Sequence, residues 1–86
     1  MRFLEINMSS LKELVEYIAR SIVAHPDDVE VIEEDNDRGR LFLTLKVHPD
    51  DKGKVIGRQG RVAQSIRSLL RVAAVKEGVH ANLDID

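Results

Sequence analysis

The 86-residue chain contains no cysteine and no tryptophan, and its only aromatic residues are one tyrosine and two phenylalanines. The lack of cysteine excludes disulfides, thiolate catalysis and cysteine-ligated metals, and is compatible with a reducing compartment. No apolar run approaches the roughly 20 residues that a membrane-spanning helix needs, and the amino terminus lacks the apolar stretch of a signal peptide. We therefore expect a soluble, cytoplasmic protein that does not enter membranes.

The length fits a single domain, residues 1–86, with one modest core, because so short a chain buries only roughly 60% of the surface it exposes when unfolded. Its net charge of −2 at pH 7 combines two opposed parts. Residues 1–37 carry three basic and ten acidic side chains, whereas residues 38–76 carry ten basic and two acidic ones. So basic a segment can neutralise phosphates, although ordinary charge scatter on a solvated surface is the alternative.

Hydrophobic periodicity predicts six elements in the order αββααβ. Between Ser9 and Ala24, apolar residues recur at intervals of three and four, which indicates an amphipathic helix capped by Ser9 or Ser10. The acidic, turn-rich segment 34–39 separates two strands and predicts an antiparallel hairpin. The expected helices cover residues 9–24, about 49–56 and 61–77, and the expected strands cover residues 29–33, 40–47 and 79–85.

A helical crossover of some thirty residues joins the last two strands, which is long enough for a right-handed parallel connection. Together with the hairpin, this connection predicts a three-stranded mixed sheet. Helices 9–24 and 61–77 each have one apolar face, so we expect both to cover the same side of the sheet. The predicted fold class is an α+β two-layer sandwich.

The most informative stretch is Gly57-Arg58-Gln59-Gly60, which joins the short helix to the long one. Gly57 can take the left-handed conformation that ends a helix, and Gly60 leaves no side chain between the backbone and an approaching phosphate. The first amides of helix 61–77 lack partners within that helix and attract anions. Two glycines at this spacing are usually a tight interhelical turn, but the basic residues around this pair favour phosphate binding.

The segment Val55-Ile56-Gly57-Arg58-Gln59-Gly60, continuing to Ile66, resembles the V-I-G-x-x-G core of KH domains. The helix-first order resembles the type II variant of that fold. Length and motif are similar to the KhpA family (YlqC-like) of stand-alone bacterial KH proteins, and the likeness spans nearly the whole chain. Ala63 departs from the pattern, because KH domains usually carry a larger aliphatic residue there, and this departure implies a shallower groove wall.

The resemblance implies a type II KH fold with no enzymatic activity and no cofactor, whose loop clamps about four nucleotides of single-stranded RNA. It also implies an RNA chaperone or post-transcriptional regulator linked to cell-envelope growth and cell shape. The implied assembly is a homodimer or a heterodimer with a KhpB (Jag-like) protein. The expected RNA-binding residues are Lys52, Lys54, Ile56, Gly57, Arg58, Gln59, Gly60, Arg61 and Gln64.

Three histidines, His25, His48 and His80, lie far apart in the sequence without the spacing of metal ligands, so we expect no metal site. The tetrapeptide His-Pro-Asp-Asp occurs twice, at 25–28 and 48–51. We interpret both copies as helix punctuation, in which the aspartates cap helices rather than act as catalytic carboxylates.

Two further arginines, Arg67 and Arg71, either extend an RNA track or face water, and we expect solvation. The scarcity of aromatic residues disfavours extended base stacking of the RRM or OB type. Nucleotide-binding glycine motifs are absent, which disfavours an NTPase or a dehydrogenase. Two alternatives stay open: a protein-interaction subunit that uses the basic loop, and a single-stranded DNA binder.

Overall fold

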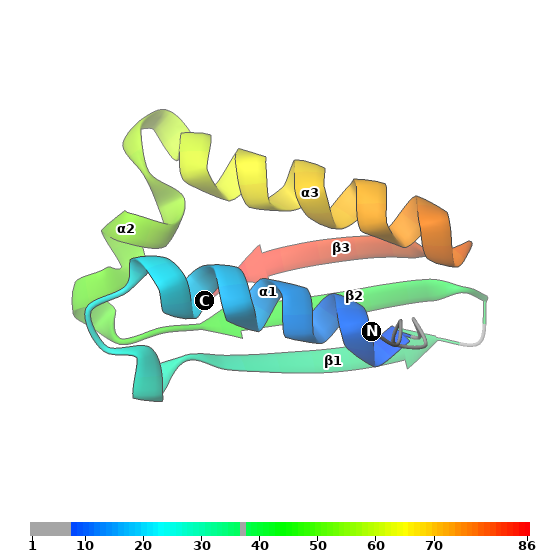
Figure 1. Ribbon diagram of the computed structural model, residues 1–86, viewed down its shortest axis with the longest axis horizontal. Helices are drawn as coiled ribbons and strands as arrows, with labels where there is room; N and C mark the ends of the chain where they lie inside the picture. The colour runs from blue at the N-terminus through cyan, green and yellow to red at the C-terminus, as the bar shows by residue number, and fades with distance from the viewer. Residues whose placement is uncertain (1–7, 37) are drawn as a thin grey trace, which may run out of the picture.

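The computed structural model describes residues 8–36 and 38–86, and side chains from residue 11 onward within those ranges. The elements are α1 (Met8–Ile22), β1 (Glu30–Asn36), β2 (Arg40–Lys46), α2 (Lys52–Ile56), α3 (Arg61–Glu77) and β3 (His80–Ile85) (Figure 1). Short 3-10 turns cover Pro26–Asp28, Pro49–Asp51 and Arg58–Gly60. The predicted order αββααβ is confirmed.

The three strands form one sheet in the order β1-β2-β3, in which β1 runs antiparallel and β3 parallel to β2. The parallel register places Leu43 opposite Leu83. Figure 1 shows α1 and α3 side by side on one face of this sheet, with α1 nearer β1 and α3 nearer β3. The predicted two-layer α+β sandwich with a mixed sheet is therefore confirmed.

The core lies between the two long helices and the sheet. On β2, Leu41, Leu43 and Leu45 are at most 1% exposed, whereas Phe42 on the opposite face is 40% exposed. This alternation follows from the two-residue period of a strand. Helix residues enter the core at the spacing of a helical face, and these are Leu11, Val15 and Ala19 from α1 and Ile66, Leu70 and Ala74 from α3.

Several element boundaries differ from the prediction, and two of these differences change an interpretation. Strand β1 continues to Asn36, so the first half of the predicted turn over 34–39 is strand. Asn36 Oδ1 accepts the amides of Arg38 at 3.0 Å and of Arg40 at 3.2 Å, which satisfies the turn and lets strand pairing extend to its edge. Helix α1 already includes Ser9 and Ser10, so neither is the residue that caps it. Phe3 lies outside the described residues.

Among the helices of the described part of the chain, none combines the length and the apolar character that crossing a membrane requires.

Candidate nucleic-acid interface

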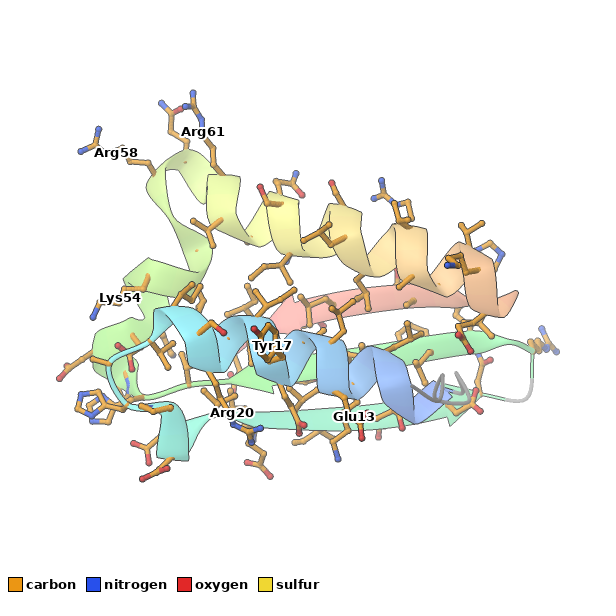
Figure 2. The ribbon with its side chains drawn as sticks, in the orientation of Figure 1. Glu13, Tyr17, Arg20, Lys54, Arg58 and Arg61 are labelled. Carbon is orange, nitrogen blue, oxygen red and sulfur yellow. The ribbon has the colours of Figure 1, made fainter. Side chains whose placement is uncertain are left out.

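The predicted loop projects from one end of the sandwich, where α2 meets α3. Between these helices, residues Arg58–Gly60 form a single 3-10 turn. The side chains of Arg58 and Gln59 are exposed, and Figure 2 shows Arg58 and Arg61 pointing into solvent, away from α1. The motif is therefore an accessible tip rather than a buried connection.

The two glycines of the motif have different roles. Gly57 has φ 77° and ψ 177°, a combination essentially restricted to glycine, and not the left-handed helical conformation that the sequence predicted. A Cβ atom at Gly57 would overlap the side chain of Val62, so packing also excludes a side chain. Gly60 is left-handed, and a Cβ atom there would meet nothing within 4 Å. The surface over Gly60 is therefore open to a ligand.

The free amides begin one turn earlier than the sequence predicted. The Gly60 amide donates to the Gly57 carbonyl at 3.2 Å, and the Arg61 amide donates to the Arg58 carbonyl, so the head of α3 is partly satisfied internally. The cause is the 3-10 turn, whose i to i+3 bonds use these donors. Within residues 8–36 and 38–86, the amides of Arg58 and Gln59 have no hydrogen-bond partner. They are the donors that an anion can reach.

The predicted cations divide into paired and unpaired ones. Lys54 Nζ lies 3.6 Å from Asp51 Oδ1, which offsets part of its charge. Arg58 and Arg61 take part in no ion pair in the described chain. Lys52 and the partly exposed Ile56 lie on α2 beside the loop, so the structure places the predicted residues together. The two guanidinium groups at the tip are therefore available to an anion.

A groove of about 390 Å³ opens between α3 and the edge strand β3. Arg67 and Arg71 line this groove. Arg71 is exposed, as expected, whereas Arg67 is only half-exposed, which differs from the expectation that it faces water. Arg67 Nε donates to the Leu83 carbonyl at 3.1 Å, which holds the arginine against the strand. Phe42 also lines the groove, so one aromatic ring does reach it. Ala63, expected to lower the groove wall, is buried and is not among the lining residues.

Half of the β3 backbone faces outward along this groove. The amides of His80 and Asp86 donate to the Gly39 and Leu45 carbonyls of the β2 side, so the even-numbered residues pair with β2. Because successive residues of a strand alternate, the backbone groups of Ala81 and Leu83 point to the open edge. The amides of both residues and the Ala81 carbonyl can bond to the edges of bases, whereas the Leu83 carbonyl already accepts Arg67 Nε.

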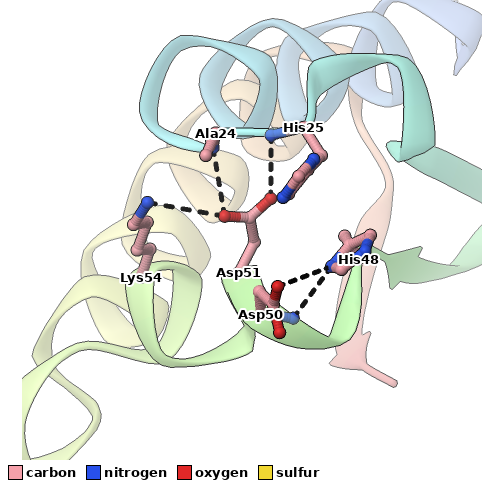
Figure 3. Close-up of polar contacts among 6 residues, drawn as sticks. All are labelled: Ala24, His25, His48, Asp50, Asp51 and Lys54. Carbon is pink, nitrogen blue, oxygen red and sulfur yellow. Dashed lines mark hydrogen bonds and ion pairs between the residues drawn. The ribbon is translucent and has the colours of Figure 1, made fainter.

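Below the loop, a buried carboxylate joins α2 to the end of α1 (Figure 3). Asp51 is fully buried, and its two oxygens accept the amides of Ala24 and His25, each at 3.0 Å. Burial by itself raises the pKa of Asp51, but the two amide hydrogen bonds and the nearby Lys54 outweigh it and lower that pKa from its usual value. The prediction that Asp51 caps the helix that follows it is wrong, because its side chain makes no capping hydrogen bond to that helix and both of its oxygens accept the amides of Ala24 and His25.

A family model described as KhpA/KhpB, KH domain, matches residues 12–85 of this chain. The chain belongs to the KhpA/KhpB family of KH domains. Its sandwich is thus a type II KH fold, and the family is one of RNA-binding proteins, not of enzymes. The family predicted from the sequence is confirmed.

Relatives of known name align with most of this chain. The RNA-binding protein KhpA of Halalkalibacterium halodurans is 53% identical over 87% of this chain and 97% of the relative. The RNA-binding protein KhpA of Bacillus subtilis is 41% identical over 87% of this chain and 91% of the relative.

Two solved structures of Era share the fold. Aquifex aeolicus Era bound to GDP and aluminium fluoride has a TM-score of 0.61 at 16% identity, covering 98% of this chain and 32% of that one. Era in complex with MgGDPNP and nucleotides of 16S ribosomal RNA has a TM-score of 0.58 at 14% identity, covering 99% and 35%. This chain therefore spans about a third of each Era chain, and at these identities the likeness shows the fold alone.

Proposed function

We propose that this protein binds single-stranded RNA, with the loop Gly57–Gly60 holding the sugar–phosphate backbone. The observation that carries the proposal is the projecting tip, whose Arg58 and Gln59 amides and whose Arg58 and Arg61 guanidinium groups lack partners in the described chain. Charge-assisted hydrogen bonds to phosphate are strong, and the open surface over Gly60 allows the backbone to approach closely. The names of the curated KhpA relatives support the same ligand.

From the loop, the proposed path of the nucleotides follows α3 toward the groove beside β3. Arg61, Gln64 and Arg71 recur at three- and seven-residue intervals along one side of the helix, and all three are exposed. Ten residues of helix span about 15 Å, a length that suits the about four nucleotides of a KH groove. Bases in the groove would meet Arg67 and the outward backbone groups of β3, so we expect modest base preference.

The cellular role that we propose is that of an RNA chaperone or post-transcriptional regulator in the cytoplasm, linked to cell-envelope growth and cell shape. One groove that holds about four nucleotides gives weak affinity, and a second RNA-binding unit raises it through effective concentration. We therefore propose a homodimer or a heterodimer with a KhpB (Jag-like) protein. The family description, which joins KhpA and KhpB, agrees with such a partnership.

The test replaces Arg58 and Gln59 together by aspartate and measures ultraviolet crosslinking and fluorescence anisotropy with an unstructured RNA. We expect binding to weaken by about tenfold or more, because phosphate contacts are replaced by repulsion. The matched control, Arg20→Asp with Ser21→Asp on α1, makes the same change in charge. Figure 2 shows Arg20 directed away from the loop, so this control should retain binding.

Circular dichroism should show the same helix and strand content in both double variants, because all four side chains are exposed. Unchanged RNA binding by the loop variant would refute the clamp. RNA and DNA oligomers of the same length and sequence distinguish the proposal from single-stranded DNA binding, since only RNA offers a 2′-hydroxyl. Loss of a protein partner with RNA affinity intact would instead support an interaction subunit.

A further inference from the structure

The two His-Pro-Asp-Asp segments of the sequence form a matched pair in space. Each begins a 3-10 turn, over Pro26–Asp28 and Pro49–Asp51, with the histidine at the position before the turn. The rings of His25 and His48 stack with their centroids 4.0 Å apart and their planes at 23°. Residues that are 23 positions apart in the chain thus present two imidazole groups at one point of the surface.

The backbone that carries these side chains is fixed from below (Figure 3). Asp51 Oδ2 accepts the His25 amide at 3.0 Å, which ties the first turn to the second. His48 Nδ1 accepts the Asp50 amide at 3.0 Å and lies 3.7 Å from the Asp50 carboxylate. The imidazole ring of His25 takes part in none of these bonds and remains exposed.

We propose that His25, His48 and Asp50 bind a divalent transition-metal ion, for which Zn²⁺ is best suited. One nitrogen or oxygen atom from each residue lies within 4.8 Å of the other two. Imidazole with carboxylate favours Zn²⁺ over Mg²⁺ or Ca²⁺, which prefer oxygen ligands. Three protein ligands leave a position for water, as in an open zinc site.

Binding requires the side chains to rearrange. Ligand atoms around tetrahedral Zn²⁺ with bonds of about 2.0–2.1 Å are about 3.4 Å apart, so atoms that now lie within 4.8 Å of one another must approach by up to about 1.4 Å. The two stacked rings must also turn, so that the in-plane lone pairs of their nitrogens converge on the ion. His25 and Asp50 are exposed and can adjust their side chains to that extent. Nδ1 of His48 would exchange the Asp50 amide for the metal, and the amide would then bond to water. The ion would join the end of α1 to the start of α2, independently of RNA binding.

The experiment is a Zn²⁺ titration of the untagged protein, followed by the imidazole resonances in NMR spectra. His80 serves as an internal control, because it begins β3 at the end of the sheet opposite to α2 (Figure 1). We expect the His25 and His48 signals to shift together and to saturate at Zn²⁺ concentrations about tenfold or more below those that affect His80. Chelation with EDTA should reverse the shifts, and Mg²⁺ at the same concentrations should leave them unchanged.

The variant His25→Ala should weaken Zn²⁺ binding by about tenfold or more, whereas His80→Ala should not change it. Because His48 also caps a turn, Asp50→Asn is the second variant, since it removes a ligand and keeps the fold. Absorption bands of bound Co²⁺ in the wild type, lost in both ligand variants, would give independent support. Equal shifts of all three histidines, or undiminished Zn²⁺ affinity in His25→Ala, would overturn the proposal.

Discussion

The charged side chains at the two ends of the five-residue helix α2 have opposite environments. Before its start, Asp51 is buried and accepts two backbone amides, with Lys54 beside it. After its end, Arg58 and Arg61 extend into solvent and form no ion pair in the part of the chain that the structure describes. A charge whose partners all lie inside the molecule serves the fold, whereas an unpartnered one is available to a ligand.

The largest effect on stability should come from Gly57→Ala, because Gly57 connects α2 to the exposed loop. The conformation of Gly57 and the contact with Val62 together predict a loss of about 2–5 kcal/mol in the free energy of unfolding. For a domain of this size, that loss lowers Tm by roughly 10 °C or more. Gly60→Ala meets open space, so it should cost only about 1–2 kcal/mol for its left-handed backbone. Equal Tm values for the two variants would contradict this account.

Next in size is Asp51→Asn, which should lower Tm, because an amide side chain has one acceptor for two backbone donors. The pKa of Asp51 is lowered in the folded state, so the unfolded state binds the proton more readily. Its stabilising contribution is therefore present above the ordinary pKa of 3.8 and is lost as pH falls below it. Unfolding curves between pH 2 and pH 7, at roughly one-unit steps, should show a flatter acid limb in the variant.

Glu33 acts in the opposite direction, because burial raises its pKa, so the Asp51 effect is measured as a difference between wild type and variant on the same background. The control is Asp50→Asn, whose carboxylate is exposed. If that control changes the acid limb as much as Asp51→Asn, the buried carboxylate is not its source.

A smaller effect on RNA binding should distinguish the unpaired Arg58 from Lys54, which is paired with Asp51. Arg58→Gln should weaken RNA binding and reduce the slope of log K against log salt by about 0.7, the value for one phosphate contact on a single strand. Lys54→Gln should reduce the slope less, because Lys54 is already paired with Asp51. Anisotropy titrations at several salt concentrations would measure both. Equal slopes for the two variants would show that the internal pairing of Lys54 has no bearing on RNA contact.

The smallest effect should come from Arg67→Lys, because lysine retains the charge but cannot place a donor at the position of Nε. Losing the hydrogen bond to Leu83 should cost about 0.5–1.5 kcal/mol in the free energy of unfolding. RNA affinity should fall only a few-fold, which competition between oligomers of different base composition would detect. Arg71→Lys, which breaks no hydrogen bond in the described residues, is the matched control.

Local patterns in the sequence were sufficient for the fold. The alternation of Leu41, Leu43 and Leu45 located the central strand, and the helical spacing of Ile66 and Leu70 located the cover of the sheet. The two glycines of the loop located the exposed tip, since their spacing between two helices predicts a tight connection. Periodicity reads these features because each depends on neighbours within a few residues.

Contacts between residues far apart in the sequence could not be predicted from such local patterns. The hydrogen-bond donors to Asp51 are backbone amides 26 and 27 residues away, and a backbone amide has no signature in sequence. Likewise, the stacking of His25 on His48 depends on how two turns meet in space. The lining of the groove by Arg67 depends on the register that brings β3 beside α3. Such contacts follow from tertiary packing, which the chain determines only as a whole.

The hydrogen bond from Arg67 to the Leu83 carbonyl also protects the sheet, because β3 is an edge strand. Edge strands expose unpaired peptide groups that can pair with a strand of another molecule, which is a common route to aggregation. The Arg67 side chain lies against the middle of this edge, where it occupies the Leu83 carbonyl and obstructs the pairing of a fourth strand. One arginine thereby helps to limit the sheet to its three members.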